Sequence, residues 1–137
     1  GMPALGLTDH GVMNGAIDHY KACREVGIKP IIGMEAYLVD DRTTLASTPR
    51  YERNHLTLLA ASDEGFSNLV KLTSAGFLEG FSRGKANVDM ELLERHAKGV
   101  IALTGCHSWF WKFHGVRVPR SIVVPPRTSV VAMLAPS

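Results

Sequence analysis

The stretch Ile28-Lys-Pro-Ile-Ile-Gly-Met-Glu-Ala-Tyr-Leu-Val39 decides how the rest of the chain is interpreted, because it predicts a largely buried β-strand. Before it, residues 13–26 carry apolar side chains at steps of mostly three and four, which predicts a helix ending at Gly27. Before that helix, residues 4–8 predict a short buried strand that stops at a polar turn. The first part of the chain is therefore predicted to be a strand–helix–strand unit.

The same alternation continues after the central strand. Residues 40–54 are polar and without period, which predicts a loop, and residues 80–87 form a second, looser stretch. The other predicted elements are a strand at 55–60, a helix capped by Ser62 and running to Gly76 or beyond, a short helix at 89–97 and a strand at 100–104. Strands that alternate with helices indicate an α/β fold, here predicted as a parallel sheet of βα units.

Length and composition exclude several classes of protein. The 137 residues are 45% hydrophobic and 20% charged, as in one packed soluble domain rather than a disordered chain. No apolar run approaches the roughly 18 residues of a membrane span, and residues 1–4 show no secretory signal. Two cysteines do not make a disulfide framework. We therefore expect a cytoplasmic protein with free thiols and no membrane contact.

The charge is divided unevenly along the chain. Residues 1–106 hold all 13 acidic residues and 11 lysines and arginines, a net charge of −2, whereas residues 107–137 hold four bases and no acid. The body therefore shows no basic surface for nucleic acid. The tail at 107–137 has no useful period, and we interpret it either as an extended, irregular apolar arm or as an out-of-frame continuation of the domain.

Polar residues of metal-ligand type stand at the ends of the predicted strands. Asp9 and His10 follow the first strand, Glu35 lies inside the second, and Cys106 follows the last. His55 begins the third strand, which fits this pattern only if the sheet is distorted. Strand ends gather side chains around one mouth in a parallel α/β fold, and an adjacent aspartate can orient a ligand histidine.

Each of these residues also has a purely structural interpretation. Asp9 could cap the following helix, His10 could be a turn residue, and His55 could be a hydrogen-bonded core histidine. Cys106 could be a small buried residue, and Cys23 on the first helix is interpreted as packing. Glu35 is harder to explain structurally, because a buried carboxylate needs a partner or a metal. Taken together, the set favours a metal site.

Seven strings of residues, in a fixed order, carry a family resemblance. They are Met2-Pro-Ala-Leu-Gly-Leu-Thr-Asp-His-Gly11, Gly27-Ile-Lys-Pro-Ile-Ile-Gly-Met-Glu-Ala-Tyr37, His55-Leu-Thr-Leu-Leu-Ala60, Gly65-Phe-Ser-Asn-Leu-Val-Lys-Leu72, Leu78-Glu-Gly80, Glu91-Leu-Leu93 and Gly99-Val-Ile-Ala-Leu-Thr-Gly-Cys106. Together they resemble the PHP (polymerase and histidinol phosphatase) domain of the alpha subunit of bacterial DNA polymerase III. They cover residues 1–106 almost without interruption, and the Gly-Ile-Lys-Pro-Ile-Ile-Gly string points to the replicative polymerase over other PHP proteins.

The resemblance implies a distorted (β/α)7 barrel with a metal cluster at one end. The family's ligand positions fall on His10, Glu35, His55 and Cys106, with Asp9 as a partner that orients the site. The implied cofactors are divalent ions, zinc or manganese, which would activate water for attack on phosphorus. In some members this makes the domain a proofreading 3′–5′ exonuclease, and in others it serves as a docking module.

The chain also departs from the family pattern. It starts after the strand that carries the family's His-x-His pair, it has no closing Asp-x-His pair, and the match stops after Cys106. We therefore expect an incomplete barrel at 1–106, with the first strand and closing units missing, followed by the non-matching tail. Unpaired sheet edges would then favour aggregation, and a partial ligand set would bind metal weakly.

The predicted function is that of a fragment of a replicative DNA polymerase subunit, catalytically silent alone, because the polymerase modules are absent from this sequence. The resemblance implies other polymerase III subunits and DNA as partners of the parent. Two alternatives are a stand-alone metal-dependent phosphoesterase of the PHP type and a non-catalytic interaction module. The absent His-x-His and Asp-x-His pairs count against the phosphoesterase.

Overall fold

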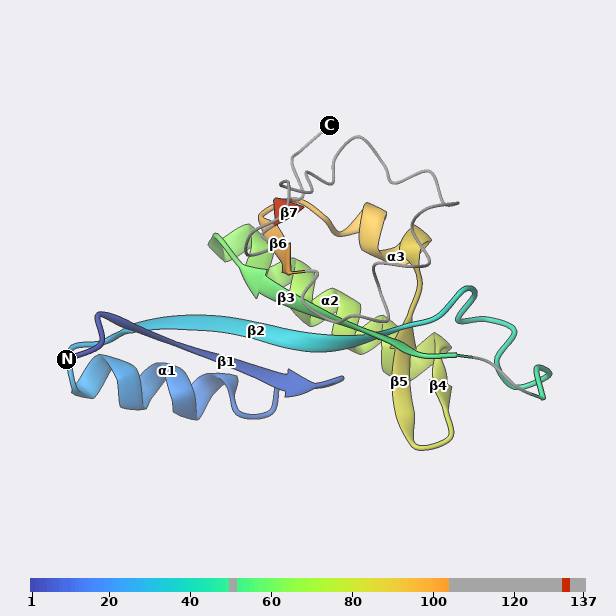
Figure 1. The fold of residues 1–137 in the computed structure, drawn as a ribbon, viewed down its shortest axis with the longest axis horizontal. Helices are drawn as coiled ribbons and strands as arrows, with labels where there is room; N and C mark the ends of the chain where they lie inside the picture. The colour runs from blue at the N-terminus through green and yellow to red at the C-terminus, as the bar shows by residue number, and fades with distance from the viewer. Residues whose placement is uncertain (50–51, 104–131, 134–137) are drawn as a thin grey trace.

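The computed structural model describes residues 1–49, 52–103 and 132–133. Within them lie three helices and seven strands that form one mixed sheet (Figure 1). In chain order they are β1 Ala4–His10, α1 Ala16–Glu25, β2 Lys29–Leu38, β3 Asn54–Ala60, α2 Asp63–Glu79, β4 Phe81–Ser82, β5 Lys85–Val88, α3 Met90–Arg95, β6 Val100–Leu103 and β7 Ala132–Met133. The α/β class predicted from the sequence is confirmed.

The prediction of an all-parallel sheet is wrong. β2 pairs in parallel with β1 and with β5, but β3 runs antiparallel to β2, and β6 runs antiparallel to β3. The residues described between β2 and β3, 39–49 and 52–53, contain no helix, and 40–49 form an irregular loop at the end of the sheet where β2 stops. A parallel pairing needs a crossover of a dozen or more residues, usually a helix, whereas a direct return gives the antiparallel direction.

β2 is the spine of the sheet and runs along most of the molecule (Figure 1). β3 occupies one of its edges over Gly33–Leu38. β1 and β5 therefore share the other edge in succession, with β1 beside Lys29–Glu35 and β5 beside Tyr37 and Leu38. The end of β1 and the beginning of β5 consequently meet at the level of Glu35.

The hydrophobic core lies between one face of the sheet and α2. Met34 and Leu58 on the strands and Leu69 and Leu72 on α2 are almost wholly buried. Because side chains alternate along a strand, Glu35 and Tyr37 belong to the opposite face from Met34. The helices thus cover one face, and the candidate site residues lie on the other.

Two helix starts predicted from the sequence are confirmed. The Ser62 hydroxyl accepts a hydrogen bond from the Gly65 N–H at 3.1 Å and so caps α2. The Asp89 carboxylate accepts one from the Leu92 N–H at 3.0 Å and caps α3. Both caps satisfy backbone donors that the first turn leaves without an intrahelical partner.

The stretch at 80–87, predicted to be loose, contains a tight hairpin instead. β4 and β5 pair with Ser82 opposite Lys85, so only Arg83 and Gly84 form the turn. Both have positive φ, 50° and 73°, as a two-residue turn of type I′ requires. Arginine is unusual at such a position, which is why the sequence gives no hairpin signal there.

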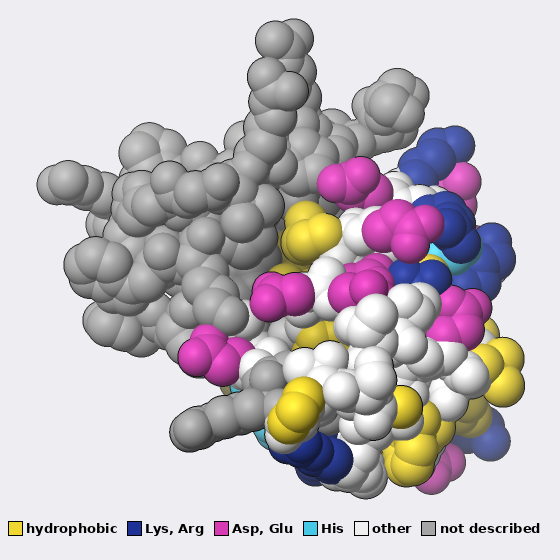
Figure 2. Space-filling view, turned by 90° about the vertical axis from the view of Figure 1, so that its right-hand side faces the viewer, with side chains coloured by type: hydrophobic (Ala, Val, Ile, Leu, Met, Phe, Trp, Pro, Cys, Tyr) yellow, Lys and Arg dark blue, Asp and Glu magenta, His cyan; other side chains and the backbone are white. Residues whose placement is uncertain are grey.

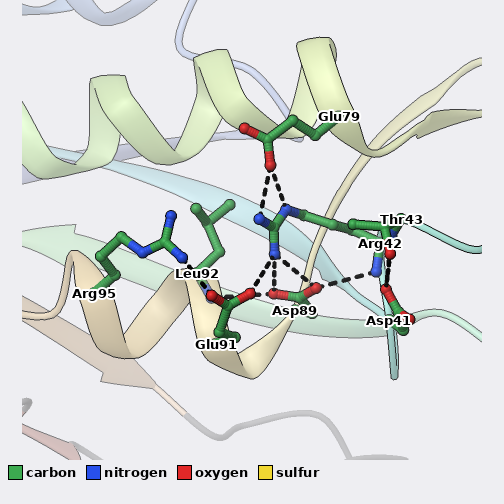
Figure 3. A network of polar contacts seen from close by, with 8 residues as sticks. All are labelled: Asp41, Arg42, Thr43, Glu79, Asp89, Glu91, Leu92 and Arg95. Carbon is green, nitrogen blue, oxygen red and sulfur yellow. Dashed lines mark hydrogen bonds and ion pairs between the residues drawn. The ribbon is translucent and has the colours of Figure 1, made fainter.

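Residues 40–49, predicted to be a loop without period, are tied to the helices through Arg42 (Figure 3). The Arg42 side chain is only 6% exposed and makes two bonds from its Nη1 to the Asp89 carboxylate, at 2.7 and 2.8 Å. It also pairs with Glu79 of α2 and Glu91 of α3. Burial alone would lower the pKa of Arg42, but these carboxylates outweigh it and hold the pKa above its usual range.

The predicted tail at 107–137 lies almost entirely outside the described residues. Only Ala132–Met133 are described, and they pair antiparallel with β6 as β7. Among the helices that the structure describes, none is both long and apolar enough to cross a membrane.

Candidate metal centre

Three side chains of metal-ligand type meet on the face of the sheet opposite α2. One ligand atom each from His10, Glu35 and His55 lies within 4.8 Å of the other two. His10 Nε2 is 3.3 Å from one Glu35 carboxylate oxygen, and His55 Nδ1 contacts the other oxygen. The Glu35 side chain is 21% exposed, and both imidazoles are more open than that. The Glu35 carboxylate therefore lies half-buried between two imidazoles that are accessible to solvent.

The direction of the strands explains how these residues meet. β1 and β2 are parallel, with His10 directly beside Glu35. β3 is antiparallel to β2, with His55 beside Tyr37. The beginning of β3 therefore lies at the same end as the last residues of β1 and β2. His55 did not fit the predicted pattern of strand ends, because that prediction had all strands running in one direction.

Asp9 faces away from this group, because neighbours on a strand point to opposite faces. Its carboxylate accepts a hydrogen bond from the Gly15 N–H at 2.8 Å, one residue before α1 begins. This contact favours the structural interpretation of Asp9, and its role as an orienting partner of the site stays a prediction. Cys106, the fourth predicted ligand, lies outside the described residues.

Cys23 takes the packing role predicted for it. It is 3% exposed on α1, and its sulfur lies 3.8 Å from the ring nitrogens of His19 on the preceding turn. The His19 ring also contacts the Leu5 carbonyl oxygen at 3.0 Å. His96 ends α3. Neither histidine belongs to the candidate metal centre.

Tyr37 and Lys85 lie near the candidate metal centre, and neither was predicted from the sequence to do so. The Tyr37 ring stands edge-on to His55 with 5.1 Å between centroids, and Lys85 Nζ lies 5.1 Å from the Tyr37 centroid. Tyr37 could have been found, because it lies two residues after Glu35 and therefore on the same face of the strand. No local signal could have found Lys85, because its position depends on the hairpin and on pairing between β5 and β2.

The described surface at the end of the molecule that carries the β4–β5 hairpin is of mixed charge. Figure 2 shows acidic side chains interspersed with lysine and arginine over this face, with apolar side chains between them. This agrees with the near balance of the two charges in residues 1–106.

The donor set fits a divalent transition metal. Imidazole nitrogen and carboxylate oxygen are the ligands that zinc and related ions take in proteins, and catalytic sites commonly hold three protein ligands with an open position. Two imidazoles and one carboxylate on three adjacent strands provide such a set. The half-open histidines leave one side accessible to a small molecule.

Comparison with known proteins identifies the domain family of residues 1–108. A family model described as "PHP domain" matches residues 1–108. The chain is similar to proteins named DNA polymerase III subunit alpha from Thermus aquaticus (45% identical over 114 residues), Helicobacter pylori strain ATCC 700392 / 26695 (46% over 106) and Aquifex aeolicus (46% over 114).

The matches cover 76–77% of this chain but only 9–10% of each relative. The chain thus spans about a tenth of the length of the curated relatives that it matches. The family match over residues 1–108, together with these identities, shows that the chain belongs to the PHP domain family.

Proposed function

We propose that this chain is part of the PHP domain of a DNA polymerase III alpha subunit, that it acts in DNA replication, and that His10, Glu35 and His55 hold a divalent metal. The convergence of three ligand atoms within 4.8 Å, from three different strands, carries the proposal. The relatives' names support the connection with the polymerase. The parent's other subunits and DNA are its proposed partners, and the cytoplasm its proposed location.

The remaining parts of the site follow from the family resemblance. We propose Cys106 as a further ligand and a distorted (β/α)7 barrel as the complete domain around the sheet described above. Zinc or manganese suits the donor set, since imidazole and carboxylate ligands serve both. A bound divalent ion there would supply Lewis acidity toward a phosphoryl oxygen and activate water for attack on phosphorus.

The protein's own residues prepare the site for such a reaction. Glu35 contacts both imidazoles, and this contact holds the two rings with ligand nitrogens turned toward one point. Tyr37 packs against His55 and limits its rotation.

The experiment is metal analysis of the purified chain after loading with zinc or manganese and dialysis against a weak chelator. We expect metal to be retained, and to be lost in His10→Ala and in Glu35→Ala. Matched controls are His19→Ala and Glu25→Ala, which remove the same residue types from α1 and should retain metal. Absence of retained metal, or equal retention in all four variants, would contradict the site.

A further inference from the structure

Lys85 shares a face of the sheet with the candidate metal centre. Tyr37 of β2 is paired with Asn87 of the parallel strand β5. Glu35 lies two residues before Tyr37, and Lys85 lies two residues before Asn87. Since side chains alternate along strands, Glu35, Tyr37 and Lys85 lie on one face, together with His10 and His55 through their own pairings. A cationic side chain therefore stands on the same side of the sheet as the three ligands.

The Tyr37 ring connects this cation with the site. Lys85 Nζ lies 5.1 Å from the centroid of the Tyr37 ring. The same ring is 5.1 Å from the His55 ring and 6.3 Å from the His10 ring, centroid to centroid. The Tyr37 ring thus neighbours both the ammonium and the imidazoles. Contact with this ring restrains a lysine side chain that would otherwise move freely in water.

The hairpin fixes the position of Lys85 on the backbone. The two-residue turn at Arg83 and Gly84 makes Lys85 the first residue of β5, opposite Ser82. Arg53 reinforces the same end: its Nε donates to the Asn87 side-chain oxygen and its Nη2 to the Ser82 carbonyl, both at 2.8 Å. Arg53 and Lys85 are therefore both held at the end of the sheet that carries Glu35.

We propose that Lys85 binds a phosphoryl oxygen of a phosphate ester brought to the metal centre. This inference rests on the proposed function, because it takes the metal centre as the place where the phosphoryl group sits. An exposed lysine on a hairpin is commonly a solvated charge, but this one is held over an aromatic ring that packs on a candidate ligand. An ammonium binds phosphate as a point charge with three donors, so it needs no further fixed geometry.

The test measures two affinities of the full chain separately: that for Mn²⁺ by electron paramagnetic resonance, and that for phenyl phosphate by NMR titration with and without a diamagnetic metal. We expect Lys85→Gln to weaken phenyl phosphate binding about tenfold, the loss of one hydrogen bond to a charged group. Its Mn²⁺ affinity should stay unchanged, and Lys85→Arg should restore most of the phenyl phosphate binding. Inorganic phosphate serves as a second probe, and equal effects on both probes assign the contact to the phosphoryl group itself.

Lys29→Gln is the matched control. Lys29 is an exposed lysine on the same face of β2 as Glu35. It lies six residues before Glu35, which separates the two residues by about 20 Å along the strand at about 3.3 Å per residue. Its removal should change neither affinity. If Mn²⁺ binds but Lys85→Gln binds phenyl phosphate as the unmodified chain does, Lys85 has no such role and the metal centre stands. If Mn²⁺ does not bind at all, the metal centre of the proposed function is contradicted, and the role of Lys85 at that centre is contradicted with it.

Discussion

Single residues decide how the irregular loop at 40–49 is held, and Arg42 is the clearest case. Its guanidinium is enclosed by three carboxylates from α2 and from the start of α3 (Figure 3). Only the Asp89 partner is itself buried, at 7% exposure. Removing the arginine alone would leave that carboxylate without its countercharge, which costs more than the ion pair contributes.

We expect Arg42→Met to lower the free energy of unfolding by about 3 to 5 kcal/mol, measured by urea denaturation. Adding Asp89→Asn should recover much of this loss, because an amide oxygen can still cap α3 at the Leu92 N–H. If the double variant is as unstable as Arg42→Met, the loss comes from side-chain packing and the unpaired charge is not its cause.

A second effect at the residue scale depends on pH. Burial lowers the pKa of His96 below its ordinary value of 6.5, and the charges of Lys71 and Arg95 lower it further. The unfolded chain therefore binds this proton at a higher pH than the folded chain does. The stability contributed by neutral His96 is present above about pH 6.5 and is lost as the pH falls through the lowered value.

We expect His96→Gln to reduce the loss of unfolding free energy between about pH 7.5 and about pH 5, because glutamine does not titrate. Urea denaturation of both proteins at a series of pH values measures the difference. Identical pH slopes in the two proteins would show that the environment of His96 is the same in the folded and unfolded states.

At the scale of the elements, α2 and the β4–β5 hairpin each depend on a glycine, for different reasons. A Cβ on Gly65, in the first turn of α2, would lie 1.8 Å from the Gly99 carbonyl oxygen. A Cβ on Gly84, in the β4–β5 turn, would meet nothing within 4 Å, but the residue has a φ of 73°. The first position excludes a side chain by contact, and the second by backbone conformation alone.

We expect Gly65→Ala to lower the free energy of unfolding by about 3 kcal/mol or more, because backbone must move to admit the methyl group. Gly84→Ala should cost only about 1 kcal/mol, the strain of an alanine with positive φ. Thermal and urea denaturation of the two variants compare these losses directly. Equal losses would mean that α2 shifts away from Gly99 without difficulty.

At the scale of the whole molecule, the sheet has an edge that the described residues leave unpaired. β1 pairs with β2 alone among the described strands, and Leu5 on β1 is 42% exposed. On the helix side of β2, Ile17 and Tyr20 of α1 and Phe66 of α2 are among the residues that line an open groove of about 460 Å³. An open strand edge beside exposed apolar side chains favours association between chains.

We expect the chain to self-associate with increasing concentration, as seen by sedimentation velocity. Leu5→Lys should shift the distribution toward the monomer, because a charge on an edge strand opposes pairing with another strand. Ala22→Lys adds the same charge on exposed α1 and is the control. A similar shift in both variants would point to net charge as the cause, and not to the β1 edge.

Local features could be predicted from the sequence: most helices and strands, the cap at Ser62, the helix start at Asp89, and the residue types at strand ends. These depend on neighbours a few positions apart, such as the Ser62 hydroxyl and the Gly65 N–H. The sequence also contained the resemblance to the PHP domain, which the comparisons confirm. The prediction of a loose stretch at 80–87 is wrong, because the residues of the turn, Arg83 and Gly84, are not those that usually signal a hairpin.

Which strands pair, and in which direction, could be learned from the tertiary structure alone. The antiparallel return of β3 brings His55 to Glu35, twenty residues earlier in the chain, and the pairing of β5 with β2 brings Lys85 to Tyr37. Arg42 likewise reaches Asp89 across 47 residues. Such contacts depend on which distant segments bury their apolar faces together, and local propensity and periodicity carry no information about that choice.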